Sequence, residues 1–367
     1  RSNSGIQMDS ELQIALIGAG IAAVVLVVGY NKWQERRHRR EAERAFKSDH
    51  RDVLLEPREE PSAGERREPG IGGADDEPRR FSEAPVKRSA PELPRLLDPR
   101  ADCVIRLETI EALEVGRVWA IQAEQLAGLG KPVYWFGFND AENVWQPIGP
   151  DSTGACHWFC AALQLVNRQG SIGETDFMRF SGGVQRVADA LMSLPPALPP
   201  RGETLRNATE LDRFCADVDV QIGINVVSRD GQFEGRAIHA VAEKHGLRLG
   251  SDGAYHMVDG EHSVFTVANL ESGRFSPESL KGLVTRGLTL VIDVPRVSNG
   301  GAAFDRMMKM ATTLAGELGG DVVDDNRAPF GVEAAAIIRS QIGQFQIRMA
   351  DHDIPAGSPL ALRLFSL

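Results

Sequence analysis

The chain is poor in cysteine. Its 367 residues include only four, Cys103, Cys156, Cys160 and Cys215, and each lies in or beside an ordinary apolar segment. Cys156 and Cys160 flank His157, but no second pair of ligands follows at the spacing of a zinc finger. We therefore predict reduced thiols that act as small core side chains in a cytoplasmic domain, and neither a metal nor another cofactor.

The chain also lacks a surplus of positive charge and the common catalytic motifs. Its net charge of -10 at pH 7 argues against nucleic acid as a partner, because phosphate binding needs a basic surface. No glycine-rich phosphate loop, nucleophile elbow or zincin helix is present. Asp324 and Asp325 are adjacent acids, but neighbouring residues of a strand point to opposite faces. We predict that the protein is not an enzyme.

What the chain does have is one long apolar run, residues 12–30, LQIALIGAGIAAVVLVVGY. As a helix this uncharged run would be about 28 Å long, close to the hydrocarbon thickness of a bilayer. A buried core helix would show a polar face, and a signal peptide would carry positive charge where Asp9 and Glu11 stand. The run predicts a retained transmembrane helix after a short outer segment, residues 1–11, in which the residues before Met8 are expected to be an extension.

The residues that follow this run predict its orientation. A dense group of basic side chains stays on the cytoplasmic side of a membrane and can contact anionic lipid headgroups. The group expected to do so here is Lys32, Arg36, Arg37, Arg39 and Arg40. We expect a single-pass protein whose N-terminus is outside and whose remainder is cytoplasmic.

A charged linker is predicted next. Residues 31–101 hold the basic flank and then a stretch dense in Glu, Arg, Pro and Gly, with few large apolar residues and no periodicity. Such a stretch buries too little surface to offset its ordering entropy. About sixty residues of coil would have a root-mean-square span of roughly 40 Å or more. We predict a disordered tether.

Folded structure is expected from residue 102. Residues 102–194 show the pattern of a strand, a helix, a hairpin, a further strand and a second helix, so we predict an α+β middle domain. Its many aromatic side chains are interpreted as core. Four prolines between residues 195 and 200 then predict a Pro-rich linker, residues 195–210.

The clearest pattern lies in residues 211–350. Apolar side chains alternate with small or polar ones at Val218, Val220, Ile222, Ile224 and Val226, which predicts a strand with one face on a core. The predicted order of elements, β-α-β-β-β-α-β-α, is typical of a split β-α-β domain of the α+β class. Its mostly antiparallel sheet would carry helices on one face and leave the other bare. Residues 351–367 are interpreted as a C-terminal tail.

In this region the sequence resembles the C-terminal domain of the ZipA family of bacterial division proteins. The matching blocks are INVVS, GLRLGSDGAYH, FTVANLESGRFSPES, GLTLVIDVP and GELGGDVVDDNR, in this order and spacing. The resemblance implies an inner-membrane adaptor at the division site. It would bind the C-terminal tail of FtsZ, the tubulin-like division protein, on the bare sheet face and tether the Z ring during septum assembly.

The middle domain is not covered by this resemblance. GRVWAIQAEQLAGLG lines up with GRAIHAVAEKHGLRLG, and QLVNRQGSIGETDFMRF with ANLESGRFSPESLKGL. Residues 102–194 are therefore interpreted as a diverged, shorter copy of the same domain, with convergence as the rival explanation. An alternative function also stays open, in which a membrane-anchored enzyme or ligand sensor has its activity in the middle domain.

Strand alternation places several small or mixed side chains on the bare face. The family's peptide-contacting positions, carried over one by one, fall on Gln221, Gly223, Asp252, Ala254, Ala268, Leu270, Thr289 and Val291. Arg327 matches a family arginine near the rim of the groove and is expected to pair with an acid or the terminal carboxylate of the tail. The competing interpretation is a solvated face without a partner.

Four of these positions depart from the family pattern. The family usually has larger apolar side chains where Gln221, Gly223, Asp252 and Ala254 stand here. Replacing one buried apolar contact by Asp removes roughly 1.5–3 kcal/mol of burial and adds a desolvation cost. We therefore expect this groove to bind a tail more weakly than the family norm, or to be tuned to another tail. The avidity of many anchored copies would compensate for a weak single contact.

Overall fold

The computed structural model describes residues 90–260 and 262–366. The predicted transmembrane helix and residues 31–89 of the predicted basic flank and linker lie outside these residues, whereas residues 90–101, also predicted as linker, are described. Within the described part of the chain, no helix has both the length and the apolar character that a membrane span requires. All described residues belong to the second of the chain's two compact units.

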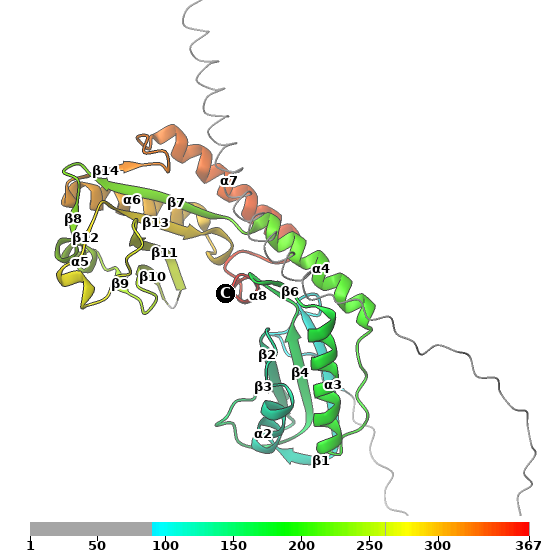
Figure 1. The fold of residues 1–367 in the computed structure, drawn as a ribbon. Helices are drawn as coiled ribbons and strands as arrows, with labels where there is room; N and C mark the ends of the chain where they lie inside the picture. Colours follow the sequence, from blue (N-terminus) through cyan, green and yellow to red (C-terminus); the bar gives the residue numbers. More distant parts are fainter. Residues whose placement is uncertain (1–89, 261, 367) are drawn as a thin grey trace, which may run out of the picture. The chain divides into compact units, whose positions relative to one another are not determined.

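The first domain is built on a four-stranded antiparallel sheet in the order β1-β4-β2-β3 (Figure 1). Its strands are β1 (Asp102–Glu114), β2 (Val133–Asn139), β3 (Val144–Pro147) and β4 (Ala155–Gln164). Two helices, α2 (Val115–Gln125) and α3 (Glu174–Ala190), pack on one sheet face. A short hairpin of β5 (Val166–Asn167) and β6 (Gly170–Ser171) precedes α3.

Alternation along the strands gives this sheet two buried faces. On β2, Trp135 joins the core under the helices, whereas its neighbour Phe136 joins a small cluster on the opposite face. The four cysteines are buried, as predicted. Burial raises the pKa of Cys103 and of Cys160 to about 12, so these two thiols are packing groups and not nucleophiles.

The second domain has a six-stranded sheet in the order β14-β7-β13-β11-β10-β9, with antiparallel neighbours throughout. Its strands are β7 (Gln221–Ser228), β9 (Arg248–Leu249), β10 (Tyr255–Asp259), β11 (His262–Asn269), β13 (Gly287–Asp293) and β14 (Gly320–Val323). Because β13 and β14 both run antiparallel to β7 between them, β13-α6-β14 is a split β-α-β unit. The predicted α+β class and antiparallel sheet are confirmed.

Helices cover one face of this second sheet. They are α5 (Gly235–Lys244) and α6 (Gly300–Leu318), and α7 (Val332–Asp351) packs beside α6. The smaller elements are the paired strands β8 (Phe233–Glu234) and β12 (Val284–Thr285) and the 3-10 turns η1 (Ser279–Lys281) and η2 (Val294–Arg296). Helix α6 ends as predicted at Gly319, whose φ of 74° suits a glycine C-cap.

The predicted start of the first strand of this domain was wrong. Ile224 and Val226 are buried in the core as expected. Val218, however, is the last residue of helix α4 (Arg201–Val218), and β7 begins only at Gln221. The helix buries Ala208, Cys215 and Val218 against the first domain. Val218 is therefore apolar because it belongs to this helix, although it also fits the period-two pattern of the strand that follows.

Helix α4 also replaces much of the predicted Pro-rich linker. It begins at Arg201, directly after Pro200. Prolines are compatible with this position because the first backbone N–H groups of a helix have no partner within it. The irregular connection between the two sheets is therefore limited to the residues before 201.

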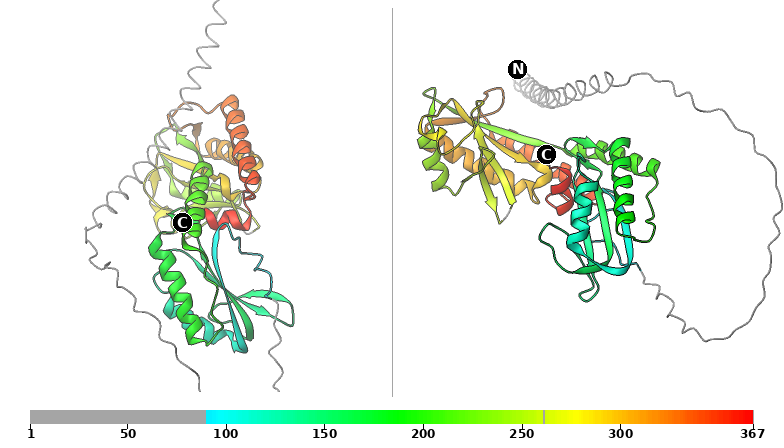
Figure 2. Two further views of the ribbon diagram at one scale, coloured as in Figure 1. Left: turned by 90° about the vertical axis from the view of Figure 1, so that its right-hand side faces the viewer. Right: turned by 60° about the horizontal axis from the view of Figure 1, so that its bottom comes forward.

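The predicted C-terminal tail is part of the first domain. It contains helix α8 (Pro359–Leu364), the red helix beside the first domain in Figure 2. Ala361, Leu364 and Phe365 are buried in the same core as residues of β1 and α3. Met349 of α7 and Ile354 join them. The chain therefore leaves the first domain through α4, forms the second domain and returns to complete the first.

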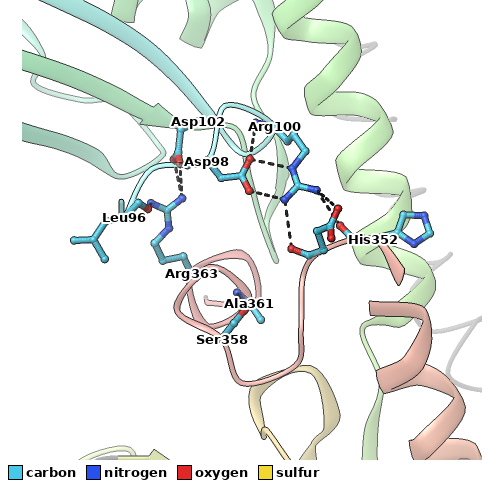
Figure 3. Close-up of polar contacts among 9 residues, drawn as sticks. Leu96, Asp98, Arg100, Asp102, His352, Ser358, Ala361 and Arg363 are labelled. Atoms are coloured by element: carbon cyan, nitrogen blue, oxygen red, sulfur yellow. Dashed lines mark hydrogen bonds and ion pairs between the residues drawn. The ribbon is translucent and has the colours of Figure 1, made fainter. Parts of the chain in front are cut away.

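An ion pair anchors this returning segment (Figure 3). The side chain of Asp102 is fully buried, and Arg363 of α8 donates to both of its carboxylate oxygens, at 2.7 and 2.8 Å. Burial raises the pKa of Asp102, and the Arg363 guanidinium opposes that shift. Nearby, Arg100 donates to the carbonyls of His352 and Asp353, so the start of β1 is tied to the chain's last residues.

The two domains share an element order but not a strand order. The main elements of each domain follow the order β-α-β-β-β-α, as an internal repeat would. In that order β2 and β3 correspond to β10 and β11. The sheet orders are β1-β4-β2-β3 and β7-β13-β11-β10, so the two strands of this hairpin have exchanged places. The repeat hypothesis stays a prediction, supported by element order and opposed by strand order.

The burial of α8 predicts that Leu364→Ala destabilises the first domain. Leu364 has no exposed surface, so the substitution should lower the free energy of unfolding by about 2–5 kcal/mol through lost burial and a cavity. Denaturant unfolding of the purified chain measures this change. The control is Ile347→Ala, which alters an exposed position on α7 and should change the free energy by less than about 0.5 kcal/mol. Equal effects would show that α8 does not hold this core.

Candidate peptide-binding face

The face of the second sheet that points away from α5 and α6 is called the open face. On its three central strands, seven apolar side chains point inward and are buried in the helix-covered core: Ile224, Val226, Phe265, Val267, Leu288, Leu290 and Ile292. The inward-facing Ile222 packs against the same core and is partly buried. Because side chains alternate along a strand, the residues between them form the open face: Gln221, Gly223, Asn225, Thr266, Ala268, Thr289, Val291 and Asp293.

Strand register brings four of the predicted site residues together. Ala268 pairs with Thr289, which pairs with Asn225, and these form one row across the sheet. Thr266, Val291 and Gly223 form the next row. Gly223, Ala268, Thr289 and Val291 are thus immediate neighbours. A Cβ added to Gly223 would lie 3.8 Å from Cγ2 of Thr289, so the strip is shallow at this point and has room for a contact.

Two further predicted residues lie at opposite ends of this strip. Gln221 pairs with Asp293 where β7 begins and β13 ends. Leu270 directly follows β11, and its N–H donates to the Gly287 carbonyl at 3.1 Å. It retains 36% of its surface exposed, which makes it the large apolar side chain available at that end.

Asp252 and Ala254 lie at the β10 margin of the open face. His256 of β10 pairs with Thr266 and extends that row, and a ring nitrogen of His256 lies 3.0 Å from Asp252 Oδ1. Burial acts to raise the pKa of Asp252, but the hydrogen bonds from His256 and the Ala254 N–H outweigh it and hold this pKa below its usual value. An anionic group therefore stands where the family has an apolar one.

The structure shows two linked hydrogen bonds, from Thr289 to Asn225 and from Asn225 to Asp325, that the sequence prediction missed. We call this chain of contacts the polar relay. Asn225 is nearly buried, its Nδ2 donates to Asp325 Oδ1 at 3.0 Å, and its Oδ1 accepts from the Thr289 hydroxyl at 2.8 Å. Alternation marks Asn225 as outward-facing, but no local pattern indicates that Asp325, one hundred residues later, reaches it. The relay places a carboxylate beside the row that holds Ala268.

Arg327 lies in the turn that carries Asp325. This turn folds back because Val323 pairs with Pro329 and the Asp324 N–H donates to the Ala328 carbonyl at 2.9 Å. Arg327 itself is exposed and has a positive φ of 62°. Since Asp325 contacts Asn225, the turn borders the open face, and Arg327 is two residues from that contact. This position is compatible with the predicted rim.

The first domain borders the open face at the end opposite to Leu270. Arg168, between β5 and β6, donates to both carboxylate oxygens of Asp293, at 2.6 and 2.7 Å, and also to Asp219. Its side chain is almost buried between these two acids. No local sequence pattern indicates this contact, because Arg168 and Asp293 lie 125 positions apart.

The open face is a mixed, shallow surface. Most of its side chains are small and half-buried and are arranged in rows on the sheet, with acids and two arginines, Arg168 and Arg327, at its margins. Among the described residues, no group of three or more His, Cys, Asp or Glu side chains could hold a metal ion. The fold and this face define a class of α+β domain whose antiparallel sheet carries helices on one side and leaves the other side open.

Comparison with known proteins gives this class a family. Residues 220–341 match the family model described as ZipA, C-terminal FtsZ-binding domain. The cell division protein ZipA of Marinobacter nauticus is 32% identical over 129 residues, which are 34% of this chain and 38% of that protein. ZipA of Ectopseudomonas mendocina is 31% identical over 149 residues, which are 39% of this chain and 55% of that protein. The resemblance to the ZipA family is confirmed for this part of the chain.

These matches are partial. The ZipA of Azotobacter vinelandii is 29% identical over 146 residues, 38% of this chain and 51% of that protein. The chain thus spans from about two fifths to just over half of the length of these three relatives. The matched region contains all the predicted tail-binding residues, whereas the first domain lies outside it.

The polar relay predicts that Asn225→Ala destabilises the second domain. The substitution removes two hydrogen bonds at a nearly buried position and leaves the Thr289 hydroxyl without this acceptor, so the free energy of unfolding should fall by about 1–3 kcal/mol. Denaturant unfolding checks this value against Asn326→Ala, at an exposed turn position where a change under about 0.5 kcal/mol is expected. If both variants unfold like the unaltered chain, the relay does not stabilise the face.

Proposed function

We propose that the protein is a single-pass adaptor of the bacterial inner membrane that binds the C-terminal tail of FtsZ on the open face. It would thereby tether the Z ring to the cytoplasmic side of the membrane at the division site. The family description of residues 220–341 supports FtsZ as the partner. The membrane anchor and the predicted linker rest on sequence alone.

The observation that carries this proposal is the register of β7, β13 and β11. It sets Gly223, Val291 and Thr266 in one row and Asn225, Thr289 and Ala268 in the next, on a sheet whose other face packs against helices. A tail peptide laid on these rows would meet a preformed surface and would lose little free energy to rearrangement of the protein.

The margins of the strip offer two different kinds of contact to a bound tail. Leu270 offers apolar surface, and Arg327 offers a guanidinium that can pair with a carboxylate of the tail. The acids at Asp252 and Asp325 make the face less apolar than the family pattern, which favours a modest affinity for a single tail. A filament presents many tails to many membrane-anchored adaptors. Each bound tail raises the effective concentration of the next, so the overall attachment would be stronger than a single contact.

A second candidate function belongs to the first domain. A cleft of about 390 Å³ is lined by the start of α2 and by residues of β2 to β4, among them Asn139, Gln146, Ser152 and Cys156. Its volume falls in the range of small-molecule sites, which is compatible with either alternative for this domain, an enzyme or a ligand sensor. Burial raises the pKa of the Cys156 thiol, and a protonated thiol is a poor nucleophile.

Substitutions at the two ends of the strip should weaken tail binding to different degrees. Leu270→Asp removes apolar contact and adds a charge that must be desolvated, so the affinity for a labelled FtsZ tail peptide should fall more than about tenfold. Arg327→Ala removes one exposed charge pair and should weaken binding only about two- to fivefold, with less dependence on salt. Fluorescence anisotropy with the full chain measures both.

The matched control is Val332→Asp, which adds the same charge at an exposed position of α7 and should leave the affinity unchanged. The full chain is the correct reagent because Leu364 and Phe365, which follow the second domain, are buried in the first. Tail binding that is insensitive to Leu270→Asp would remove the open face from the proposal. Loss of binding in all three variants would indicate a site sensitive to net charge alone.

A further inference from the structure

The end of the open face at which β13 finishes is built from both domains. Asp293 is the last residue of β13, and it pairs in register with Gln221 at the start of β7. Its carboxylate accepts hydrogen bonds from Arg168 Nη1 at 2.7 Å and from Arg168 Nη2 at 2.6 Å. Arg168 lies between β5 and β6 of the first domain. The last row of outward side chains therefore contacts a residue of the other domain.

The first domain holds Arg168 in place. The backbone N–H of Arg168 donates to the carbonyl of Ser366 at 3.2 Å. Lys131 donates to the side chain of Asn167 and, at 2.6 Å, to the carbonyl of Gly170, and these two residues flank the turn that carries Arg168. A peptide that reached this end of the open face would therefore meet a guanidinium whose position is already set, which limits the cost of ordering it.

One guanidinium serves two acids at this junction. Arg168 Nε and Nη2 donate to Asp219 Oδ1 at 3.1 and 2.9 Å, in addition to the two bonds to Asp293. The side chain of Arg168 is only 11% exposed, and that of Asp293 is 23% exposed. A planar guanidinium can make two parallel bonds to one carboxylate, whereas a lysine would supply the charge without this geometry. Arg168 is thus both the counter-charge and the geometric partner of Asp293.

Arg168 sets the charge at this end of the face. In the part of the chain that the structure describes, no other cationic side chain forms an ion pair with Asp293. Without the guanidinium, an ionised carboxylate would stand unpaired on a surface that must lose water when a peptide binds, which is unfavourable. Asp293 is two residues beyond Val291, about 7 Å along the strand. Its charge would act on a peptide over the Gly223 row, because this distance is within the screening length of about 8 Å.

A bound tail brings negative charge to the open face. A C-terminal tail ends in a carboxylate, and the proposed contact with Arg327 requires such a group. The margins of the face already hold Asp252 and Asp325, and neither forms an ion pair with an arginine or lysine of the described chain. Like charges at close range repel each other, so an unpaired acid at Asp293 would further oppose the binding of the tail.

We propose that the tail-binding site is composite, and that Arg168 of the first domain is a positioning residue that neutralises Asp293 on the open face of the second. The partner that this arrangement suits is a peptide with an anionic group. The inference rests on the proposed function. It gives the first domain, which lies outside the family match at residues 220–341, a part in binding the tail.

The first test measures the affinity of the full chain for a labelled FtsZ tail peptide by fluorescence anisotropy. Arg168→Ala should weaken binding about three- to tenfold at low salt. The loss should shrink as salt is added, because salt screens the charge of Asp293, whereas a purely mechanical loss would not shrink. The matched control is Arg117→Ala, which removes an exposed arginine of α2 in the same domain and should change the affinity less than about twofold.

The second test asks whether the charge at Asp293 causes the loss. Arg168→Ala combined with Asp293→Asn should recover most of the affinity, although the bonds between the domains stay broken. Arg168→Lys, which keeps the charge, should lose less affinity than Arg168→Ala. If the double variant binds as weakly as Arg168→Ala, or if lysine is no better than alanine, neutralisation of Asp293 is not the role of Arg168.

A folding control and a clear order of outcomes complete the design. If circular dichroism shows that Arg168→Ala is unfolded, Arg168→Gln replaces it, because glutamine keeps a hydrogen-bond donor and removes the charge. An unaltered chain that fails to bind the tail contradicts the proposed function itself. An unaltered chain that binds the tail no better than a folded, uncharged variant at position 168 overturns the composite site alone.

Discussion

The described structure depends on one closure, in which the last residues of the chain complete the core of the first domain. Asp102 begins the first strand with its carboxylate fully buried, and such a group is tolerated only with a close, well-oriented partner. Arg363, from the far end of the chain, supplies two hydrogen bonds to it. Leu364 and Phe365 enter the apolar core at the same place, so charge pairing and burial reinforce each other.

This closure makes the second domain an insertion within the first. The chain passes out through α4, whose Val218 belongs to the first core, and returns through α7, which gives Ile342 to the second core and Met349 to the first. Arg168 adds a third link through Asp219 and Asp293. A tail bound as proposed on the open face would therefore meet a sheet that is held at both chain ends and at one strand end, which limits the freedom of the sheet to reorganise.

Sequence patterns predicted the parts of this structure that are encoded locally. The alternation at Ile224 and Val226 and the glycine stop at Gly319 located strands and helices, and with the family resemblance they placed Gly223, Ala268, Thr289 and Val291 on one face. Features that depend on distant partners were missed. Helix α8 is a short apolar segment that resembles a tail until its core is known, and the contacts of Asp325 with Asn225 and of Arg168 with Asp293 join residues at least one hundred positions apart.

The central claim is that the open face of the second sheet is where the partner binds. The most direct measurement is the change in backbone amide NMR shifts of the isotope-labelled full chain when FtsZ tail peptide is added. The account predicts saturable shifts at Gly223, Ala268, Thr289 and Val291, with little change along α5 on the covered face. Shifts confined to residues 102–190, with the second sheet unaffected, would contradict it.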